Sequence, residues 1–296
     1  MVGGPGGRRR RRAAAEPQPP PALPVSDAEF ARYQALINRE AGIWLAPVKK
    51  ALLVGRLARR LRELGIDSYG AYFQRVEADE VERIRMLDAI CTNETHFFRE
   101  PRHFEFLEQR LYPAWRADAD AGRRPRRIRA WSAACSTGEE PYTLAMSLLA
   151  SFPSGWDLQV LASDLSTRVL DRADAGVWPI EKAKEIPEEH LKAFMLKGFG
   201  AQEGLMKAGP EIRALVRIAR VNLVGEALPP GPFDLVFCRN VLIYFDRATK
   251  VRVVERLLDR LHPAGYLFLG HAESLGGFTT RARPIVPTVY SPAPAA

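Results

Sequence analysis

The chain has 296 residues, 47% hydrophobic and 26% charged, a composition typical of a soluble globular protein with one large domain or two. It contains no run of about 18 apolar residues, and the arginines at 8–12 lead into alanine and proline rather than an apolar segment, so neither a membrane span nor a secretory signal is predicted. The net charge is +8, but five arginines and one glutamate place +4 of it in residues 1–25, and the mildly basic remainder makes no strong demand for nucleic acid.

Residues 1–25 are rich in glycine, arginine, alanine and proline and are predicted to form a disordered tail. The pattern then becomes helical. Ser26 and Glu29 have the spacing of a capping box at the start of a first helix. A second helix is predicted over 47–64, ended by Gly65, and two more over 69–76 and 79–90. We therefore expect an N-terminal all-helical domain over 26–90.

The second helix has a leucine stripe on one face and a strongly basic opposite face. Cationic side chains on that face include Lys49, Lys50, Arg56, Arg59 and Arg60. Such a face either stays solvated or docks on an acidic partner.

A linker is expected over 91–105, where Phe97 and Phe98 lie between Thr95 and Arg99. The two aromatics could anchor the linker alone, with Arg99 in solvent, or form an apolar wall beside the hydrogen-bonding groups of a site. Another helix begins at Pro101.

From residue 106 to 292 we predict an α/β domain. Strands are expected near 128–133, 158–163, 213–221, 233–238 and 266–270, helices near 139–151, 166–175 and 247–261, and a final strand pair near 280–291. This alternation indicates a mostly parallel, Rossmann-like sheet. The stretch 178–213 is too long for a connecting loop, so a small inserted β-subdomain is expected at about 180–222.

The run Trp131-Ser-Ala-Ala-Cys-Ser-Thr-Gly-Glu-Glu-Pro-Tyr142 predicts a strand, a tight turn at Gly138 and a helix. Glu139 and Glu140 suit the positive end of the helix but would repel a pyrophosphate. A cationic nucleoside without phosphate, such as S-adenosylmethionine, fits this turn better. A helix start with no ligand would show the same acids.

Four polar residues follow successive predicted strands: Glu139, Asp164, Asn222 and Asn240. Ligands of doubly wound sheets bind at such carboxyl ends, where an acid can hold ribose hydroxyls. Singly, Asp164 could be a helix N-cap and each asparagine a turn residue. Cys91, Cys135 and Cys238 lie far apart and have no metal-ligand spacing, so free buried thiols and no metal are expected.

Four ordered motifs closely resemble the CheR family, the chemoreceptor glutamate O-methyltransferases of bacterial chemotaxis. These motifs are Thr92-Asn-Glu-Thr-His-Phe-Phe-Arg99, the run Trp131–Tyr142, Phe233-Asp-Leu-Val-Phe-Cys-Arg-Asn-Val-Leu-Ile-Tyr-Phe-Asp246 and Gly270-His-Ala-Glu-Ser274. The resemblance extends from about Ser26 to Tyr290.

The resemblance implies a methyltransferase that uses S-adenosylmethionine and releases S-adenosylhomocysteine, with no metal. It implies catalytic roles for Arg99 and Tyr244. By motif position, the residues expected to contact the cofactor are Asn93, Thr95, Arg99, Glu139, Asp164, Asn222, Leu223, Asn240 and Val241.

The implied partner is the cytoplasmic domain of a chemoreceptor (methyl-accepting chemotaxis protein). The basic helix over 47–64 is expected to contact it. The glycine-rich stretch Lys197–Gly204 resembles the subgroup that adds a receptor C-terminal peptide to its β-subdomain. A cytoplasmic monomer, with neither nucleic acid nor membrane insertion, is expected.

Two other functions fit parts of the pattern. A nucleic-acid methyltransferase would suit the basic tail, but the run Asn240–Tyr244 lacks the two prolines of the loop in amino methyltransferases. A non-catalytic adaptor that senses S-adenosylmethionine would keep the same fold. The arginine-rich run 123–129 has no assigned role.

Overall fold

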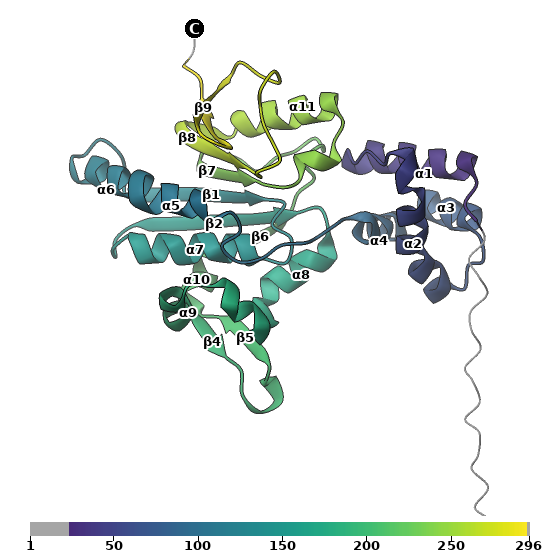
Figure 1. Ribbon diagram of the computed structural model, residues 1–296, viewed down its shortest axis with the longest axis horizontal. Helices are drawn as coiled ribbons and strands as arrows, with labels where there is room; N and C mark the ends of the chain where they lie inside the picture. The colour runs from purple at the N-terminus through teal and green to yellow at the C-terminus, as the bar shows by residue number, and fades with distance from the viewer. Residues whose placement is uncertain (1–23, 295–296) are drawn as a thin grey trace, which may run out of the picture.

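Helices α1 (Asp27–Ala41), α2 (Lys50–Leu64), α3 (Tyr69–Ala78) and α4 (Glu80–Ile90) form the first domain of the computed structural model, which describes residues 24–294 (Figure 1). The capping box is confirmed, because Ser26 accepts from the Glu29 N–H while Glu29 accepts from Ser26. A 3₁₀ turn over Pro47–Lys49 leads into α2, and Gly65 ends it in the left-handed conformation, as predicted. Of the predicted disordered tail, residues 1–23 lie outside the described residues. Val25 is buried against the helices, so there the prediction was wrong.

A buried ion pair joins α2 to α4. Glu82 is 2% exposed, and its two oxygens accept from the Arg60 guanidinium at 2.7 and 2.6 Å and from the Tyr72 hydroxyl at 2.8 Å. Burial alone would raise the pKa of Glu82, but the bonds from Arg60 and Tyr72 hold it below its ordinary value. This carboxylate is therefore fully compensated inside the helical domain.

A seven-stranded sheet forms the second domain within the described residues, in the order β6-β2-β1-β7-β8-β10-β9. Its strands are β1 (Arg127–Ala133), β2 (Asp157–Asp164), β6 (Val216–Arg220), β7 (Phe233–Cys238), β8 (Leu261–Leu269), β9 (Ala282–Val286) and β10 (Val289–Pro292). The first five in spatial order are parallel, and β10 and β9 close the edge in antiparallel register. The predicted mostly parallel sheet is confirmed.

Helices cover both faces of this sheet (Figure 1). On one face lie α5 (Pro101–Phe106), a π-helical segment (Leu107–Leu111), α6 (Tyr112–Asp120), α7 (Glu139–Ser151) and α8 (Thr167–Ala175), and on the other lies α11 (Arg247–Leu258). The apolar core is accordingly split into two layers, one under each set of helices. Gly138, the N-cap residue before α7, has φ +96°, and a Cβ there would lie 3.0 Å from Ala173 of α8, so the turn requires glycine.

The predicted insertion is a three-stranded antiparallel sheet in the order β3-β5-β4. It consists of β3 (Val177–Pro179), β4 (Met195–Lys197) and β5 (Leu205–Ala208), with α9 (Glu188–Phe194) inside it and α10 (Pro210–Leu215) leading back to β6. Figure 1 shows it projecting from the main sheet below α7 and α8.

The arginine run before β1 is paired locally. Arg123 pairs with Asp118, Arg126 with Asp120, and Arg124 with Asp234 at 2.9 Å. Arg124 also stacks on the Trp115 ring at 4.2 Å. Much of the cluster's charge is thus compensated by neighbouring acids.

Two other expectations concern the thiols and the membrane. Cys135 and Cys238 are buried as predicted, whereas Cys91 is half-buried, and burial raises its pKa to about 12.

None of the helices between residues 24 and 294 has the length and apolar character needed to cross a bilayer.

Candidate active site

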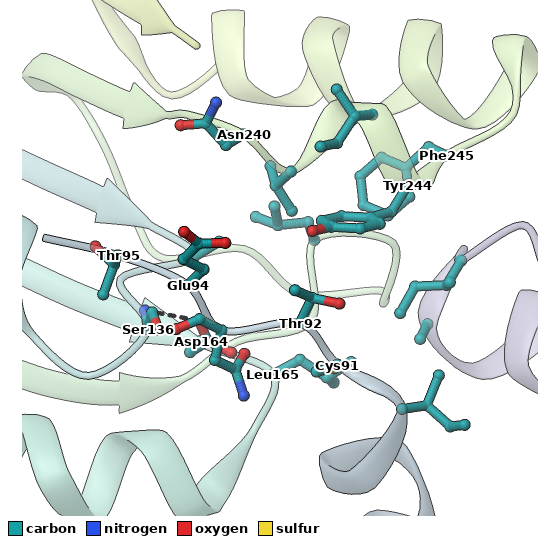
Figure 2. Close-up of a pocket in the computed structure, with 18 of the residues that line it drawn as sticks. Cys91, Thr92, Glu94, Thr95, Ser136, Asp164, Leu165, Asn240, Tyr244 and Phe245 are labelled. Carbon is teal, nitrogen blue, oxygen red and sulfur yellow. Dashed lines mark hydrogen bonds between the residues drawn. The ribbon is translucent and has the colours of Figure 1, made fainter. Parts of the chain in front are cut away.

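A cavity of about 320 Å³ lies between the helical domain and the carboxyl ends of the parallel strands (Figure 2). The segments after β1, β2, β6 and β7 form one wall, the linker after α4 forms a second, and the end of α1 with the start of α2 forms a third. From β1 the sheet grows outward to β2 and β6 on one side and to β7 and β8 on the other. Doubly wound sheets bind their ligands at such a reversal point, beyond the carboxyl ends of the strands. Its volume is at the small end of the usual range for ligand pockets.

Backbone strain concentrates around this cavity. Of the six non-glycine residues between 24 and 294 with positive φ, five lie in its walls or beside Arg99: Phe98, Glu100, Ala134, Ser136 and Asn240. Such conformations persist only where the surrounding structure enforces them, and they gather at functional sites.

The linker is fixed by side chains from every neighbouring unit. Arg56 of α2 donates to the Ile90 carbonyl and to the Thr92 hydroxyl. Further along, the Asn93 carbonyl accepts from Ser136 at 2.9 Å and the Thr95 carbonyl from Lys182 at 3.0 Å. The linker is therefore a wall of the cavity rather than a free tether.

Asp164 is the last residue of β2 and lines the cavity. Its two oxygens accept from the backbone N–H groups of Ser136 at 2.9 Å and Ser166 at 3.0 Å, the first drawn in Figure 2. Burial raises the pKa of Asp164 despite these bonds, and no ion pair to it exists among the described residues. It is an oriented acceptor whose charge the protein leaves uncompensated.

Glu139 was expected at the cofactor, and its placement corrects that prediction. It is 1% exposed, pairs with Lys182 at 2.8 Å and accepts from the Thr137 hydroxyl, and it does not line the cavity. Its neighbour Glu140 lines the cavity instead. Successive helical residues point about 100° apart, so only one acid of the pair can face the site.

Arg239 ties Glu140 to the linker. It donates to Glu140 at 3.2 Å, pairs with Glu100 at 3.1 Å and donates to the Arg99 carbonyl. Glu140 also accepts from Ser132 at 2.6 Å, yet burial keeps its pKa raised. Arg239 thereby holds the backbone of Arg99, whose side chain lines the cavity. Arg239 lies within the motif Phe233–Asp246, but its role in this network was not predicted from the sequence.

Glu100, His103 and His271 lie together beside this network. The pKa of His103 is lowered to about 4, chiefly by burial and secondly by the positive charge of Arg239. Arg239 already pairs with Glu100, and its positive charge would repel a metal ion bound at these three residues. The geometry therefore favours an ion-pair network at this position.

A single buried carboxylate shapes the loop after β7. Glu273, 5% exposed, accepts from the N–H groups of Asn240 at 2.8 Å, Gly270 at 2.7 Å and Ile243 at 3.3 Å. A Cβ at Gly270 would lie 2.5 Å from the Asn240 amide nitrogen, so the two motifs fit only with glycine there. Asn240 Oδ1 is buried and has no hydrogen-bond partner among residues 24–294. The predicted site residue Tyr244 lies on the wall opposite Asp164 (Figure 2).

The remaining predicted cofactor residues all line the cavity: Asn93, Thr95, Asn222, Leu223 and Val241. Asn222 is also structural, because its amide donates to the Glu40 carbonyl of α1 at 2.6 Å and accepts from the Val224 N–H. The sequence did not predict several lining residues, among them the polar Glu94 and Ser136. Glu94 lay between two residues that were named.

The predicted docking residues separate into different environments. Arg60 is bound to Glu82 and has a side chain only 18% exposed, and Arg56 holds the linker, so neither belongs to a free docking face and that prediction was wrong for both. Lys50 pairs with Asp27 at 2.7 Å, and Lys49 lines the cavity. Arg59 has an 83% exposed side chain that, within the described part of the chain, bonds to Glu63 of its own helix alone.

The acids in the cavity lining, Glu94, Glu140 and Asp164, come from the linker, α7 and β2. Four cations also line the cavity: Lys49 and Arg56 from the helical domain, Arg99 from the linker and Arg239 after β7. Carboxylates in this lining fit a cationic sulfonium nucleoside, and the uncompensated Asp164 is an acceptor that suits its ribose hydroxyls. The residues present therefore suit S-adenosylmethionine.

Two family models together match most of the chain. Residues 28–91 match "CheR methyltransferase, all-alpha domain", and residues 93–290 match "CheR methyltransferase, SAM binding domain".

Curated relatives match nearly end to end. The chemotaxis protein methyltransferase of Salmonella typhimurium is 39% identical over 275 residues, covering 91% of both chains. Chemotaxis protein methyltransferase 2 of Pseudomonas aeruginosa is 39% identical, covering 90% of this chain and 93% of the relative. A solved glycopeptide N-methyltransferase, MtfA with S-adenosylmethionine, is distant at 16% identity and a TM-score of 0.30, covering 55% of this chain and 53% of that one.

Proposed function

Because the chain belongs to the CheR methyltransferase family, we propose that it transfers the methyl group of S-adenosylmethionine to glutamate side chains of chemoreceptors, giving glutamate methyl esters. The observation that carries this proposal is the division of charge in the cavity. The carboxylates of Glu94, Glu140 and Asp164 suit a cationic methyl donor, and the cationic side chains of Lys49 and Arg99 in the same lining suit an incoming carboxylate.

The proposed reaction needs no general base. A glutamate with an ordinary pKa of about 4.3 is already ionised at neutral pH. One carboxylate oxygen uses a lone pair to form a bond to the methyl carbon, the carbon–sulfur bond breaks, and its electron pair returns to sulfur. The positive sulfonium becomes a neutral thioether, S-adenosylhomocysteine, and no proton moves. No imidazole lines the cavity among residues 24–294, in keeping with this chemistry.

Catalysis by this chain then consists of alignment and exclusion of water. Asp164 is assigned to the ribose hydroxyls, and Glu94 and Glu140 to the cationic end of the donor. Arg99, held at its carbonyl by Arg239, steers the incoming carboxylate, and Tyr244 positions the reacting groups from the opposite wall. Arg99 must attract the carboxylate without holding it so tightly that its nucleophilicity is lost.

The test is transfer of labelled methyl groups to chemoreceptor cytoplasmic fragments, followed by mild alkali. Volatile labelled methanol is expected, because carboxyl methyl esters hydrolyse under these conditions. Alkali-stable label would identify another acceptor and overturn the proposal. No label despite binding of S-adenosylhomocysteine would favour an adaptor that does not catalyse transfer.

A second contact with the receptor is proposed at the inserted subdomain. Strand β4 is an edge strand carrying Leu196, 54% exposed, and Phe199, 86% exposed, lies just beyond it. An extended receptor C-terminal peptide would add to this edge through backbone hydrogen bonds and cover the two side chains. Pull-down with receptor tail peptides is expected to succeed with the wild type and to fail with Leu196→Glu. Equal capture by both would contradict this contact.

A further inference from the structure

The inserted subdomain bonds to the backbone of the linker that forms one wall of the cavity. Lys182, in the 3₁₀ segment Ile180–Glu185 that follows β3, donates to the Thr95 carbonyl at 3.0 Å. Glu185, the last residue of that segment, accepts from the Phe97 N–H at 3.0 Å. The bonded residues are 87 and 88 positions apart in the chain, so the insertion fixes two peptide groups of a distant segment.

Two rings of the subdomain also pack on the aromatic pair of the linker. Trp178 of β3 meets the Phe97 ring edge-on, with centroids 5.0 Å apart. His190 of α9 meets the Phe98 ring edge-on at 5.2 Å. Phe97 is 1% exposed, so this contact belongs to the core and is not a surface encounter. Trp178, Lys182, Glu185 and His190 together are called the linker clamp below.

The linker clamp acts on a segment that lines the cavity and carries strained backbone. Thr95 and Arg99 both line the cavity (Figure 2 labels Thr95). On either side of Arg99, Phe98 has φ +49° and Glu100 has φ +58°. Such conformations persist only where neighbouring contacts enforce them, and the linker clamp supplies contacts immediately before the strained stretch.

A buried carboxylate holds Lys182 in place. Glu139 is 1% exposed and pairs with the Lys182 ammonium at 2.8 Å, while the Lys182 side chain is 27% exposed. Apolar residues packed at the same position would serve stability as well as a buried ion pair or better. The stability of the subdomain therefore does not explain the pair, whereas the bond from its cation to the Thr95 carbonyl gives it a use.

We propose that Lys182 is a positioning residue for the methyl-donor site, an inference that rests on the proposed roles of Thr95 and Arg99. Glu139 orients the Lys182 ammonium, and the ammonium fixes the Thr95 carbonyl. Lys182 itself is outside the cavity lining, so it acts through the linker and not on the donor. The inserted subdomain is then a structural part of the cofactor site, in addition to any contact that it makes with a receptor.

Lys182→Met tests the proposal, because it keeps most of the side chain and removes the ammonium. Affinity for S-adenosylhomocysteine, measured by calorimetry, is expected to fall about tenfold, since a charge-assisted hydrogen bond to the linker is lost. Capture of a receptor tail peptide at β4 is expected to stay within about twofold of wild type. Unchanged affinity for S-adenosylhomocysteine would overturn the proposal.

The single variant also leaves Glu139 buried without its cation, so its loss of affinity could come from weakened packing. The double variant Lys182→Met/Glu139→Gln removes both charges and is expected to unfold in urea at a concentration close to that of wild type. Its affinity for S-adenosylhomocysteine is expected to stay about tenfold low. A double variant that recovers affinity together with stability would show that Lys182 only neutralises Glu139, and the proposal would be wrong.

Glu139→Gln alone completes the comparison. It removes the buried carboxylate but keeps the ammonium that donates to Thr95, so affinity for S-adenosylhomocysteine is expected to stay within about threefold of wild type. A loss as large as that of Lys182→Met would assign the effect to Glu139 and contradict a positioning role for Lys182.

Glu185 offers a test at the second linker bond. Glu185→Gln retains an oxygen that can accept from the Phe97 N–H, whereas Glu185→Leu does not. Only the leucine variant is expected to lose affinity for S-adenosylhomocysteine, by about three- to tenfold. Equal affinities in the two variants would show that the Phe97 bond plays no part in the cofactor site.

The matched control is Lys192→Met on α9, which removes an exposed cation of the same subdomain. Lys192 has a 73% exposed side chain that pairs with Glu188 of its own helix. Its affinity for S-adenosylhomocysteine is expected to equal that of wild type. A tenfold loss in this control would show that net charge, and not the position of Lys182, governs binding.

These binding measurements need no receptor and therefore separate this proposal from the proposed function. A wild type that binds S-adenosylhomocysteine but gives no methyl ester would overturn the reaction alone. A wild type that gives ester, with wild-type affinity for S-adenosylhomocysteine in the double variant, would overturn the positioning role alone.

Discussion

The helical domain and the cavity each bury a carboxylate, and the surrounding structure compensates only one of them. Glu82 receives a guanidinium and a phenol hydroxyl, and these partners hold its pKa below the ordinary value against burial. Asp164 receives only backbone N–H groups, and burial raises its pKa. A compensated charge stabilises a fold, whereas an uncompensated charge is poised for a ligand. The contrast assigns Glu82 to architecture and supports the proposed cofactor role of Asp164.

The largest expected effect is on the compensated side. Glu82→Gln removes the buried counter-ion of Arg60 and leaves only the more exposed carboxylate of Glu63 beside the guanidinium, so the free energy of unfolding should fall by about 3 kcal/mol. Urea unfolding measures this loss. Glu77→Gln, which breaks an exposed pair with Arg32 on the same domain, is the matched control and should cost less than about 1 kcal/mol. Similar losses in the two variants would contradict the assignment of Glu82.

Glu273 sharpens the comparison, because it is a compensated carboxylate that supports the cavity. Glu273→Ala leaves the N–H groups of Asn240, Gly270 and Ile243 without their acceptor, and the loop that carries Tyr244 should lose its fixed position. Methyl transfer is expected to fall about 10–100-fold, a cost of about 1–3 kcal/mol. Steady-state kinetics with saturating S-adenosylmethionine measures it. Full activity would show that the loop is positioned by other contacts.

His103 supplies an intermediate case with a defined pH dependence. Its pKa is lowered to about 4, so the ring is neutral in the folded state and gains a proton on unfolding between about pH 6.5 and pH 4. The unfolded state then binds more protons, and His103 should cost stability as the pH falls through this window. The stability difference between wild type and His103→Gln should shrink by about 2 kcal/mol from pH 7 to pH 4.5. A difference independent of pH would contradict the lowered pKa.

The smallest effect is expected at the exposed charge of α2. Arg59→Glu should raise the receptor KM about three- to tenfold at low salt, with the effect diminishing as salt is added. Arg75→Glu on α3, where the arginine is 58% exposed and paired with Asp79, is the matched control. Equal effects of the two substitutions would show that net charge, rather than the position of Arg59, governs docking.

The sequence predicted those features that depend on local pattern. The capping box at Ser26, the end of α2 at Gly65 and the strands with their parallel arrangement follow from periodicity and turn chemistry. Asp164, Asn222 and Asn240 were placed together because the carboxyl ends of parallel strands share one edge.

What could not be predicted depends on contacts between distant segments. Arg60 looked like part of a free basic face until its partner Glu82, 22 residues away, was seen in the fold. The choice of Glu140 over Glu139 for the cavity depends on where Lys182 of the inserted subdomain lies. Glu273 gathers three N–H groups from two motifs, and no spacing rule reveals such a contact.

The most direct test of the comparison is Asp164→Asn, measured both for affinity and for stability. Calorimetry with S-adenosylhomocysteine should show a loss of affinity of about 30–100-fold, because a charged acceptor for the ribose hydroxyls is gone. Urea unfolding of the free protein should change by less than about 1 kcal/mol, since removing an uncompensated buried charge offsets the weakened backbone bonds. Retained affinity, or a loss of stability as large as that of Glu82→Gln, would contradict the account.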